Sequence, residues 1–196
     1  MFRLLPLCFL IFLFACNGLG ALVPSSTGVT VKFHADQKFT PDERAEIDAA
    51  VNVWRTQTSG LANISVTYDL TPETKTDPVI VRAQGTDVGV LLMDALNGCS
   101  GPCILGYATK AIQNTKDKDQ LMLVIVTDRS KASSAGLRMV IVHEIGHALG
   151  LSHISDSYAV MYPYSNQDQK GCLTIPDLSE FCRVNLCGKT ELKPCQ

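Results

Sequence analysis

The segment that most constrains this chain is an apolar helix that carries polar side chains. Residues 140–149 read Val-Ile-Val-His-Glu-Ile-Gly-His-Ala-Leu, so apolar residues surround the polar ones on nearly every side of a predicted helix. Such a helix must be buried, and a buried imidazole or carboxylate is costly unless it has a partner. A bound cation would provide that partner.

The spacing of these polar residues suits a single metal ion. His143 and His147 are four residues apart, so a helix places both imidazoles on one face, where they can bind the same ion. Glu144 projects about a quarter turn away and can reach a water molecule on that ion without binding the ion itself. Paired polar residues also occur on solvated helix faces, but the apolar surroundings argue against that here.

A third ligand follows the helix. Gly150 lies three residues after His147, where a glycine in the left-handed conformation can end a helix and turn the chain back. His153 would then return as a third nitrogen ligand. Three protein ligands leave one tetrahedral position for water, which is the arrangement of a catalytic zinc and not of a structural one.

The extended pattern resembles a known family signature. The run 143–153, followed by a turn around Met161, resembles the metzincin signature of zinc endopeptidases. Residues 153–163 look most like the matrixin branch, the matrix-metalloprotease-like peptidases. In two other branches a tyrosine two residues after the methionine can reach the metal; Pro163 stands there in this chain, so no tyrosine ligand is expected. The motif-bearing resemblance covers residues 133–182.

The resemblance implies a fold class of α/β (α+β), namely a metzincin-like catalytic domain with a mixed twisted sheet, an active-site helix and a C-terminal helix. It also implies a zinc-dependent metalloendopeptidase that hydrolyses peptide bonds in extracellular proteins through a zinc-bound water activated by Glu144. His143, His147 and His153 would bind one catalytic Zn2+. Glu144 would be the general base and proton shuttle, and Met161 would form an apolar floor beneath the metal.

Two further parts of the chain match the family less closely. Residues 173–177 resemble the start of the matrixin C-terminal helix, which implies that Asp177 supports the methionine turn through backbone hydrogen bonds; a simple helix-start role is the alternative. Gly106, Tyr107 and Ala108 resemble the edge strand along which these enzymes bind the substrate backbone by β-augmentation. The expected partner is therefore a protein or peptide substrate in extended conformation.

The chain departs from the matrixin pattern in its other metal ligands. Matrixins usually carry a second, structural zinc bound largely by histidines, but this chain has four histidines and three are assigned to the catalytic metal. His34 alone cannot form that site and is expected at the surface near a strand end. Asp87, Asp94 and Asn97 lie in a predicted loop over residues 85–102, but their spacing does not form a calcium motif, so Ca2+ remains an option without clear support.

Local patterns order the elements as strand, helix, several strands, helix and helix, which agrees with the fold class. Trp54 is expected in the core. Alternating or continuous apolar residues predict strands at 29–33, 64–68, 79–82, 104–108 and 121–126, the last a central strand buried on both faces. Helix-start signatures and helical spacing predict helices at 41–57, from Ser133 or Ser134 through the histidines, and at 175–186.

Composition narrows the class of protein further. The formal net charge is -2 and there is no long basic run, so nucleic-acid binding is not expected. The length suits one domain, and a monomer is expected. A non-catalytic, zinc-stabilised adhesin or binding module is the rival to a peptidase, but a structural zinc would need the three histidines and not Glu144.

The N-terminal region predicts export. One positive charge precedes an apolar stretch that is shorter than the ~20 residues a helix needs to span a bilayer, so residues 1–20 are expected to be a signal peptide. Residues 21–196 would then be the metallopeptidase domain, with a disulfide-rich C-terminal segment. The sequence Leu13-Phe14-Ala15-Cys16 resembles a bacterial lipobox, which would anchor the chain to a bacterial membrane through a lipid on Cys16. Cleavage after Gly20 would instead release a soluble secreted protein.

Six cysteines follow this region, and an even number in an exported chain implies disulfides. Cys99 and Cys103 flank a turn-forming Ser-Gly-Pro insert and are expected to form a local bridge. A second zinc site is the alternative for the cysteines, but thiolates in an oxidising compartment usually pair. The other four lie within the last 25 residues and imply a stapled C-terminal segment: Cys172, Cys182, Cys187 and Cys195.

Thiol titration of the exported protein, unfolded without reductant, tests this interpretation. We expect none of the six cysteines to react, because all six would be held in three disulfides. Two or more reactive thiols would contradict it.

Overall fold

A computed structural model describes residues 28–70, 88–93, 106–115, 118–127, 134–164, 169, 171–188 and 191–195. The predicted signal peptide, the predicted strand at 79–82, the Cys99–Cys103 pair and the three candidate calcium ligands lie outside these ranges. No helix within the described ranges is long and apolar enough to cross a membrane. The elements are β1 (Val29–Asp36), α1 (Pro41–Gln57), β2 (Ala62–Leu70), β3 (Val88–Met93), β4 (Gly106–Thr115), β5 (Lys118–Thr127), α2 (Ser134–Ala148) and α3 (Ile175–Asn185).

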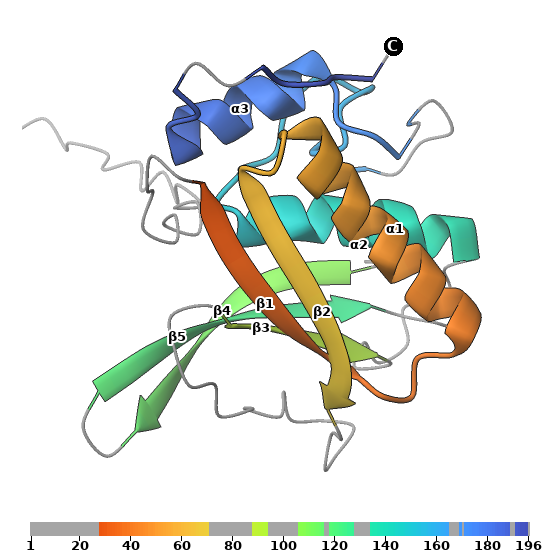
Figure 1. Cartoon of the computed structure of the whole chain (residues 1–196), viewed down its shortest axis with the longest axis vertical. Helices are drawn as coiled ribbons and strands as arrows, with labels where there is room; N and C mark the ends of the chain where they lie inside the picture. Colours follow the sequence, from red (N-terminus) through yellow and green to blue (C-terminus); the bar gives the residue numbers. More distant parts are fainter. Residues whose placement is uncertain are drawn as a thin grey trace, which may run out of the picture.

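The strands form one mixed sheet in the order β2-β1-β3-β5-β4. Strand β1 pairs in parallel with β2 and β3, and β3 pairs in parallel with β5. Strand β4 pairs antiparallel with β5 and lies at the edge. The sheet and its helices are those of the predicted α/β class, with an active-site helix and a C-terminal helix (Figure 1).

Strand β3 corrects the prediction that residues 85–102 form a loop. Val90 aligns with His34 of β1 on one side and with Val124 of β5 on the other. Nearby glycine and aspartate residues suggested a loop, but a strand paired on both sides gains hydrogen bonds that local sequence does not reveal. Strand β4 also runs further than the predicted 104–108.

Helix α1 begins where its sequence predicts. The hydroxyl oxygen of Thr40 accepts a hydrogen bond from the backbone N–H of Glu43 at 3.4 Å, and the Glu43 carboxylate accepts one from the backbone N–H of Thr40 at 2.7 Å. This capping box satisfies donors that the first helical turn leaves without partners. Pro41 occupies the first helical position, where its missing N–H costs nothing.

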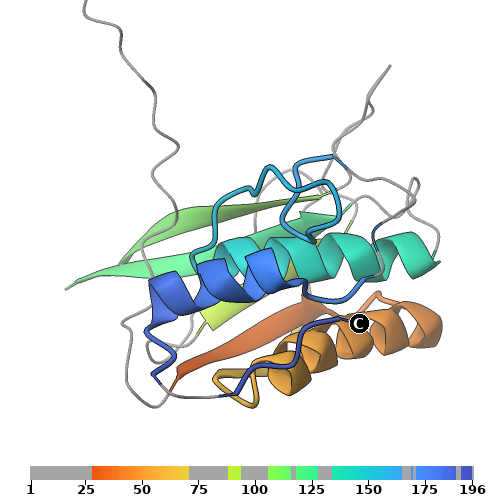
Figure 2. The same cartoon turned by 90° about the horizontal axis from the view of Figure 1, so that it is seen from above.

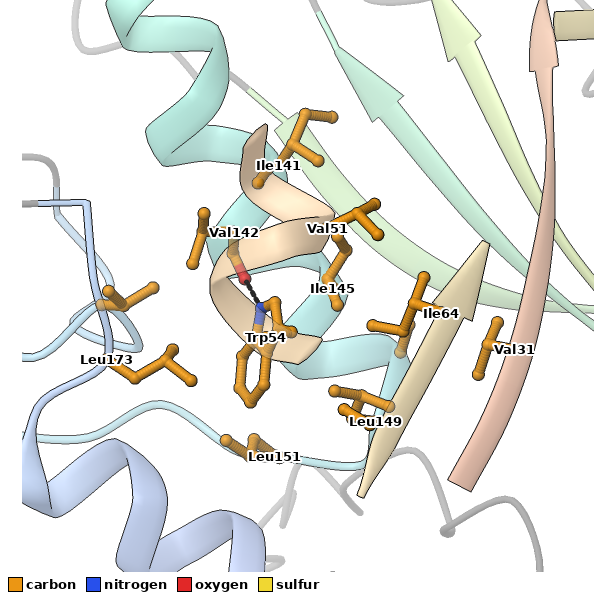
Figure 3. Close-up of a cluster of buried hydrophobic side chains, with 14 of the residues drawn as sticks. Val31, Val51, Trp54, Ile64, Ile141, Val142, Ile145, Leu149, Leu151 and Leu173 are labelled. Atoms are coloured by element: carbon orange, nitrogen blue, oxygen red, sulfur yellow. Dashed lines mark hydrogen bonds between the residues drawn. The ribbon is translucent and has the colours of Figure 1, made fainter. Parts of the chain in front are cut away.

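The core lies between the sheet and two helices. Helices α1 and α2 pack against each other over one face of the sheet, and α3 lies on the side of α2 away from the sheet (Figures 1 and 2). Trp54 is fully buried, as predicted, and its indole N–H donates a hydrogen bond to the Val142 carbonyl at 2.9 Å (Figure 3). Its ring also contacts Phe181 of α3, with centroids 5.9 Å apart. Trp54 therefore joins α1, α2 and α3.

The C-terminal segment is stapled, as the cysteine count predicted. Disulfides join Cys172 to Cys195 and Cys182 to Cys187. The Gln57 side chain, at the end of α1, accepts from the backbone N–H of Leu173 at 2.7 Å and donates to the Lys193 carbonyl at 2.8 Å. These contacts fix the chain on both sides of α3 to the end of α1.

Candidate zinc site

The end of α2 redirects the chain toward the third histidine. The N–H of Leu151 donates to the Gly146 carbonyl at 2.9 Å, and the N–H of Gly150 donates to the His147 carbonyl at 3.0 Å. These two bonds form a Schellman motif. Gly150 has a φ of 92°, the left-handed conformation that the sequence predicted for it.

The three histidines come together in space. One ring nitrogen from each of His143, His147 and His153 lies within 4.8 Å of the others. The Nε2 atoms of His147 and His153 are 3.2 Å apart. Two nitrogens bound to one tetrahedral zinc at 2.0–2.1 Å would lie about 3.3 Å apart, so this pair already has the separation of a bound pair. Among the described residues, these histidines are the one cluster of three or more His, Cys, Asp or Glu close enough to hold a metal.

Backbone carbonyls orient two of the three rings. The Nδ1 atom of His143 lies 2.7 Å from the Val160 carbonyl oxygen, and that of His147 lies 2.9 Å from the Leu151 carbonyl oxygen. A carbonyl only accepts, so each Nδ1 must carry the proton. Each Nε2 then has a free lone pair for a metal, because the hydrogen bond on one ring nitrogen decides which nitrogen can bind.

Burial keeps these imidazoles neutral. Desolvation lowers the pKa of His143 from 6.5 to about 4, against the opposing effect of its bond to Val160. Burial likewise lowers the pKa of His147 and of His153. Only a neutral imidazole has a lone pair for a metal ion, so the three histidines need lose no proton at neutral pH to bind one.

Two buried residues, Glu144 and Met161, accompany the histidines in this part of the chain. Glu144 is only 4% exposed although it carries a carboxylate, and it follows His143 directly on α2. Met161 is fully buried. A side chain at Gly146 would overlap the Met161 sulfur and press on the Trp54 ring, so the glycine allows the methionine to pack directly against α2. That Met161 forms an apolar floor beneath the metal stays a prediction.

Asp177 fixes the turn that contains the methionine. Its carboxylate accepts hydrogen bonds from the N–H groups of Val160 and Met161, each at 3.0 Å. It also accepts from the N–H and the hydroxyl of Thr174, each at 2.8 Å, at the start of α3. Both roles left open by the sequence, turn support and helix start, are therefore filled by one fully buried carboxylate.

The predicted substrate residues begin the edge strand. Gly106, Tyr107 and Ala108 are the first residues of β4 and pair with β5 through Thr127, Val126 and Ile125. Within the described ranges, no strand pairs with the other side of β4. That these residues bind the substrate backbone stays a prediction.

His34 stands apart from the metal cluster. It lies near the end of β1, and its Nδ1 atom is 2.8 Å from a carboxylate oxygen of Asp69 on β2. Its side chain is only 19% exposed, so His34 is partly buried, whereas the sequence predicted a surface position. The histidine–carboxylate pair accounts for this partly buried position.

Sequence reasoning did not identify every residue that supports the site. The carbonyls of Val160 and Leu151 are main-chain groups, which no residue type reveals. Asn185, at the end of α3, donates hydrogen bonds to the carbonyls of Leu149 and Phe181 at 3.1 Å each. An asparagine at a helix end is also a common helix terminator, so its identity gave no signal of this contact.

The fold and the site together define a zinc metallopeptidase of the metzincin type. The defining features are the three converging imidazoles, the carboxylate that follows His143, the methionine turn and the mixed sheet. Comparison with known proteins identifies the family within this class. The matrixin family model (peptidase family M10) matches residues 19–181. The chain belongs to the matrixin family, and its three histidines fit the catalytic zinc site of that family.

Individual relatives are distant or match over a short stretch. Matrix metalloproteinase-18 of Xenopus laevis is 60% identical over 35 residues, which are 17% of this chain and 8% of that protein. High choriolytic enzyme 1, a hatching enzyme zinc-protease from Oryzias latipes, superposes with a TM-score of 0.52 at 13% identity, over 84% of this chain and 92% of that one. Archaemetzincin from Methanopyrus kandleri gives a TM-score of 0.52 at 16% identity, over 84% and 98%. At such identities the two structures show a shared fold.

The lowered pKa of His143 predicts a pH dependence of stability. Between about 4 and 6.5 the unfolded chain binds a proton at this histidine and the folded, metal-free chain does not. Protons therefore favour unfolding, and the free energy of unfolding should fall as the pH is lowered through this window. Urea unfolding in the presence of a chelator measures the slope. His143→Asn should give a shallower slope, and equal slopes for both proteins would contradict the prediction.

Proposed function

We propose that this protein is a zinc-dependent metalloendopeptidase that hydrolyses peptide bonds in extracellular proteins. The observation that carries the proposal is the convergence of His143, His147 and His153, with the buried Glu144 next to His143 on α2. Three protein ligands leave a position open, which suits catalysis. Zinc held there supplies an electrophile that acidifies water and polarises a peptide carbonyl.

Glu144 would move the proton in this reaction. It follows His143 directly on α2 and is only 4% exposed, and in our proposal its carboxylate reaches a water on the metal without binding the metal itself. In our proposal it accepts a proton from the attacking water and returns that proton to the leaving amide nitrogen. The chemistry supports this role, since a zinc held only for structure would not need a carboxylate there.

Strand β4 would bind the substrate. An extended peptide could pair with the outer backbone groups of residues 106–108, because within the described ranges β4 is the edge strand and pairs with β5 alone. Backbone pairing of this kind binds a peptide in the extended conformation, and its main-chain hydrogen bonds depend little on the peptide's sequence. Monomeric action is sufficient, because all the proposed residues belong to one chain.

A non-catalytic, zinc-stabilised binding module is the second candidate. The same three histidines would hold its metal, and the stapled C-terminal segment would suit a module of this kind. The presence of Glu144 beside His143 in the chain favours the peptidase, because a zinc held only for structure needs the three histidines and not that carboxylate.

We further propose that residues 1–20 direct export and that residues 21–196 are the mature catalytic domain. The disulfides of the C-terminal segment support an oxidising location. Two mature forms remain in competition, a soluble protein that begins at Ala21 and a lipoprotein that begins at Cys16.

Mass spectrometry of the mature N-terminus distinguishes these forms. A lipid on Cys16 should place the protein in the membrane fraction, and Cys16→Ser should move it into solution, because the acyl chains are then absent. Conversely, an N-terminus at Ala21 would exclude the lipid anchor and leave the secreted form.

Glu144→Gln tests the mechanism. Glutamine has nearly the same size and can still hydrogen-bond water, so zinc content and fold should be retained. The variant lacks a base, and general acid–base catalysis is worth roughly 10²–10⁴ in rate, so peptidase activity should fall by about that factor. Zinc content by elemental analysis and cleavage of a peptide library, with and without chelator, measure both quantities.

His147→Ala is the matched control, because it should lose zinc and activity together when two nitrogens remain. A Glu144→Gln protein that holds zinc and cleaves peptides within a few-fold of wild type would show that Glu144 is not the base. Wild-type protein that holds zinc and cleaves nothing would favour the binding module.

A further inference from the structure

The third histidine depends on the chain that leads to it. His143 and His147 lie on α2, whereas His153 is exposed and lies beyond the helix on an irregular segment. The direction of that segment is set at Leu149 and Gly150, where α2 ends. Whatever fixes this helix end therefore also fixes the approach of His153 to the other two rings.

The helix end needs a donor from elsewhere in the chain. The last carbonyls of a helix lack partners within it. The Schellman motif satisfies the carbonyls of Gly146 and His147. The Leu149 carbonyl is instead satisfied by Asn185, whose side-chain amide donates to it at 3.1 Å from a position 36 residues later in the chain.

Asn185 is held firmly in place. It is 3% exposed, and its amide nitrogen also donates to the Phe181 carbonyl at 3.1 Å within α3. Leu186 follows it in the left-handed conformation, with a φ of 52°. The Cys182–Cys187 disulfide closes the short stretch that contains Asn185, so its backbone has little freedom.

Helix α3 contacts the same segment at other points. Asp177 holds the N–H groups of Val160 and Met161, which lie after His153. The Glu180 carboxylate, which Arg183 binds at 2.6 Å, also receives a backbone hydrogen bond from Ser152, directly before His153. Thus α3 binds the segment on both sides of the third histidine.

We propose that Asn185 is a positioning residue for the zinc ligand His153, and that it acts by anchoring the Leu149 carbonyl to α3. This inference rests on the proposed zinc site, but it does not require peptide cleavage. Without the amide of Asn185, the end of α2 would leave a buried carbonyl unsatisfied and the following turn would shift. The metal would then have to order His153 as it binds, which lowers affinity.

Asn185→Leu tests the proposal, because leucine has a similar size and lacks the donor. Loss of an outer support of a metal ligand typically costs 10–100-fold in metal affinity, so the zinc dissociation constant should rise by about 10-fold or more. The absorption spectrum of the cobalt(II)-substituted protein should also change, because the ligand geometry changes. Ser179→Ala, at an exposed position of the same helix, is the matched control and should leave both unchanged.

Urea unfolding of the metal-free proteins shows whether Asn185→Leu is folded. A folded variant with weaker zinc binding reports a loss of positioning and not a general loss of stability. A folded Asn185→Leu protein with wild-type zinc affinity and cobalt spectrum would overturn the proposal. If that variant does not fold, the double variant Cys182→Ser with Cys187→Ser decides, since it frees Asn185 without removing the amide. Weaker zinc binding is expected there, and unchanged binding would overturn the idea. A wild type that binds zinc but cleaves no peptide would refute the proposed function alone.

Discussion

The candidate zinc site depends on two hydrogen bonds between imidazole rings and the main chain. The carbonyls of Val160 and Leu151 accept hydrogen bonds from the Nδ1–H groups of His143 and His147, which leaves both Nε2 lone pairs free for a metal. A side chain could rotate away, but a carbonyl moves only with its backbone. The site is therefore as well ordered as the turns that carry these two carbonyls, and much of the surrounding structure serves to fix those turns.

The core and the site share the same helix, so packing and chemistry cannot be separated. The indole N–H of Trp54 donates a hydrogen bond to the carbonyl of Val142, the residue before His143. Gly146 lies between the two histidines in the sequence, and its missing side chain leaves room for Met161. The apolar packing that stabilises α2 also desolvates its imidazoles and lowers their pKa values. Burial thus favours the neutral form that binds metal, at the cost of requiring partners for every polar atom nearby.

The sequence predicted those features that local chemistry determines. The capping box at Thr40, the glycine turn at Gly150 and the histidine spacing each follow from contacts within a few residues. Features that depend on distant partners were not predictable in the same way. Strand β3 was expected to be a loop because its identity depends on β1 and β5, and the contact of Asn185 with Leu149 joins two helices through a residue type common at helix ends.

The two disulfides near α3 matter because this helix is short. An isolated helix of 11 residues is marginal in water, since helices shorter than ~12–15 residues gain too little from propagation. Disulfides immediately before it and across its C-terminal end remove conformations from the unfolded state. A short helix made rigid in this way can hold the segment that carries His153 before any metal arrives. The conformational entropy of the segment that carries His153 is then lost during folding. Metal binding does not have to offset that loss.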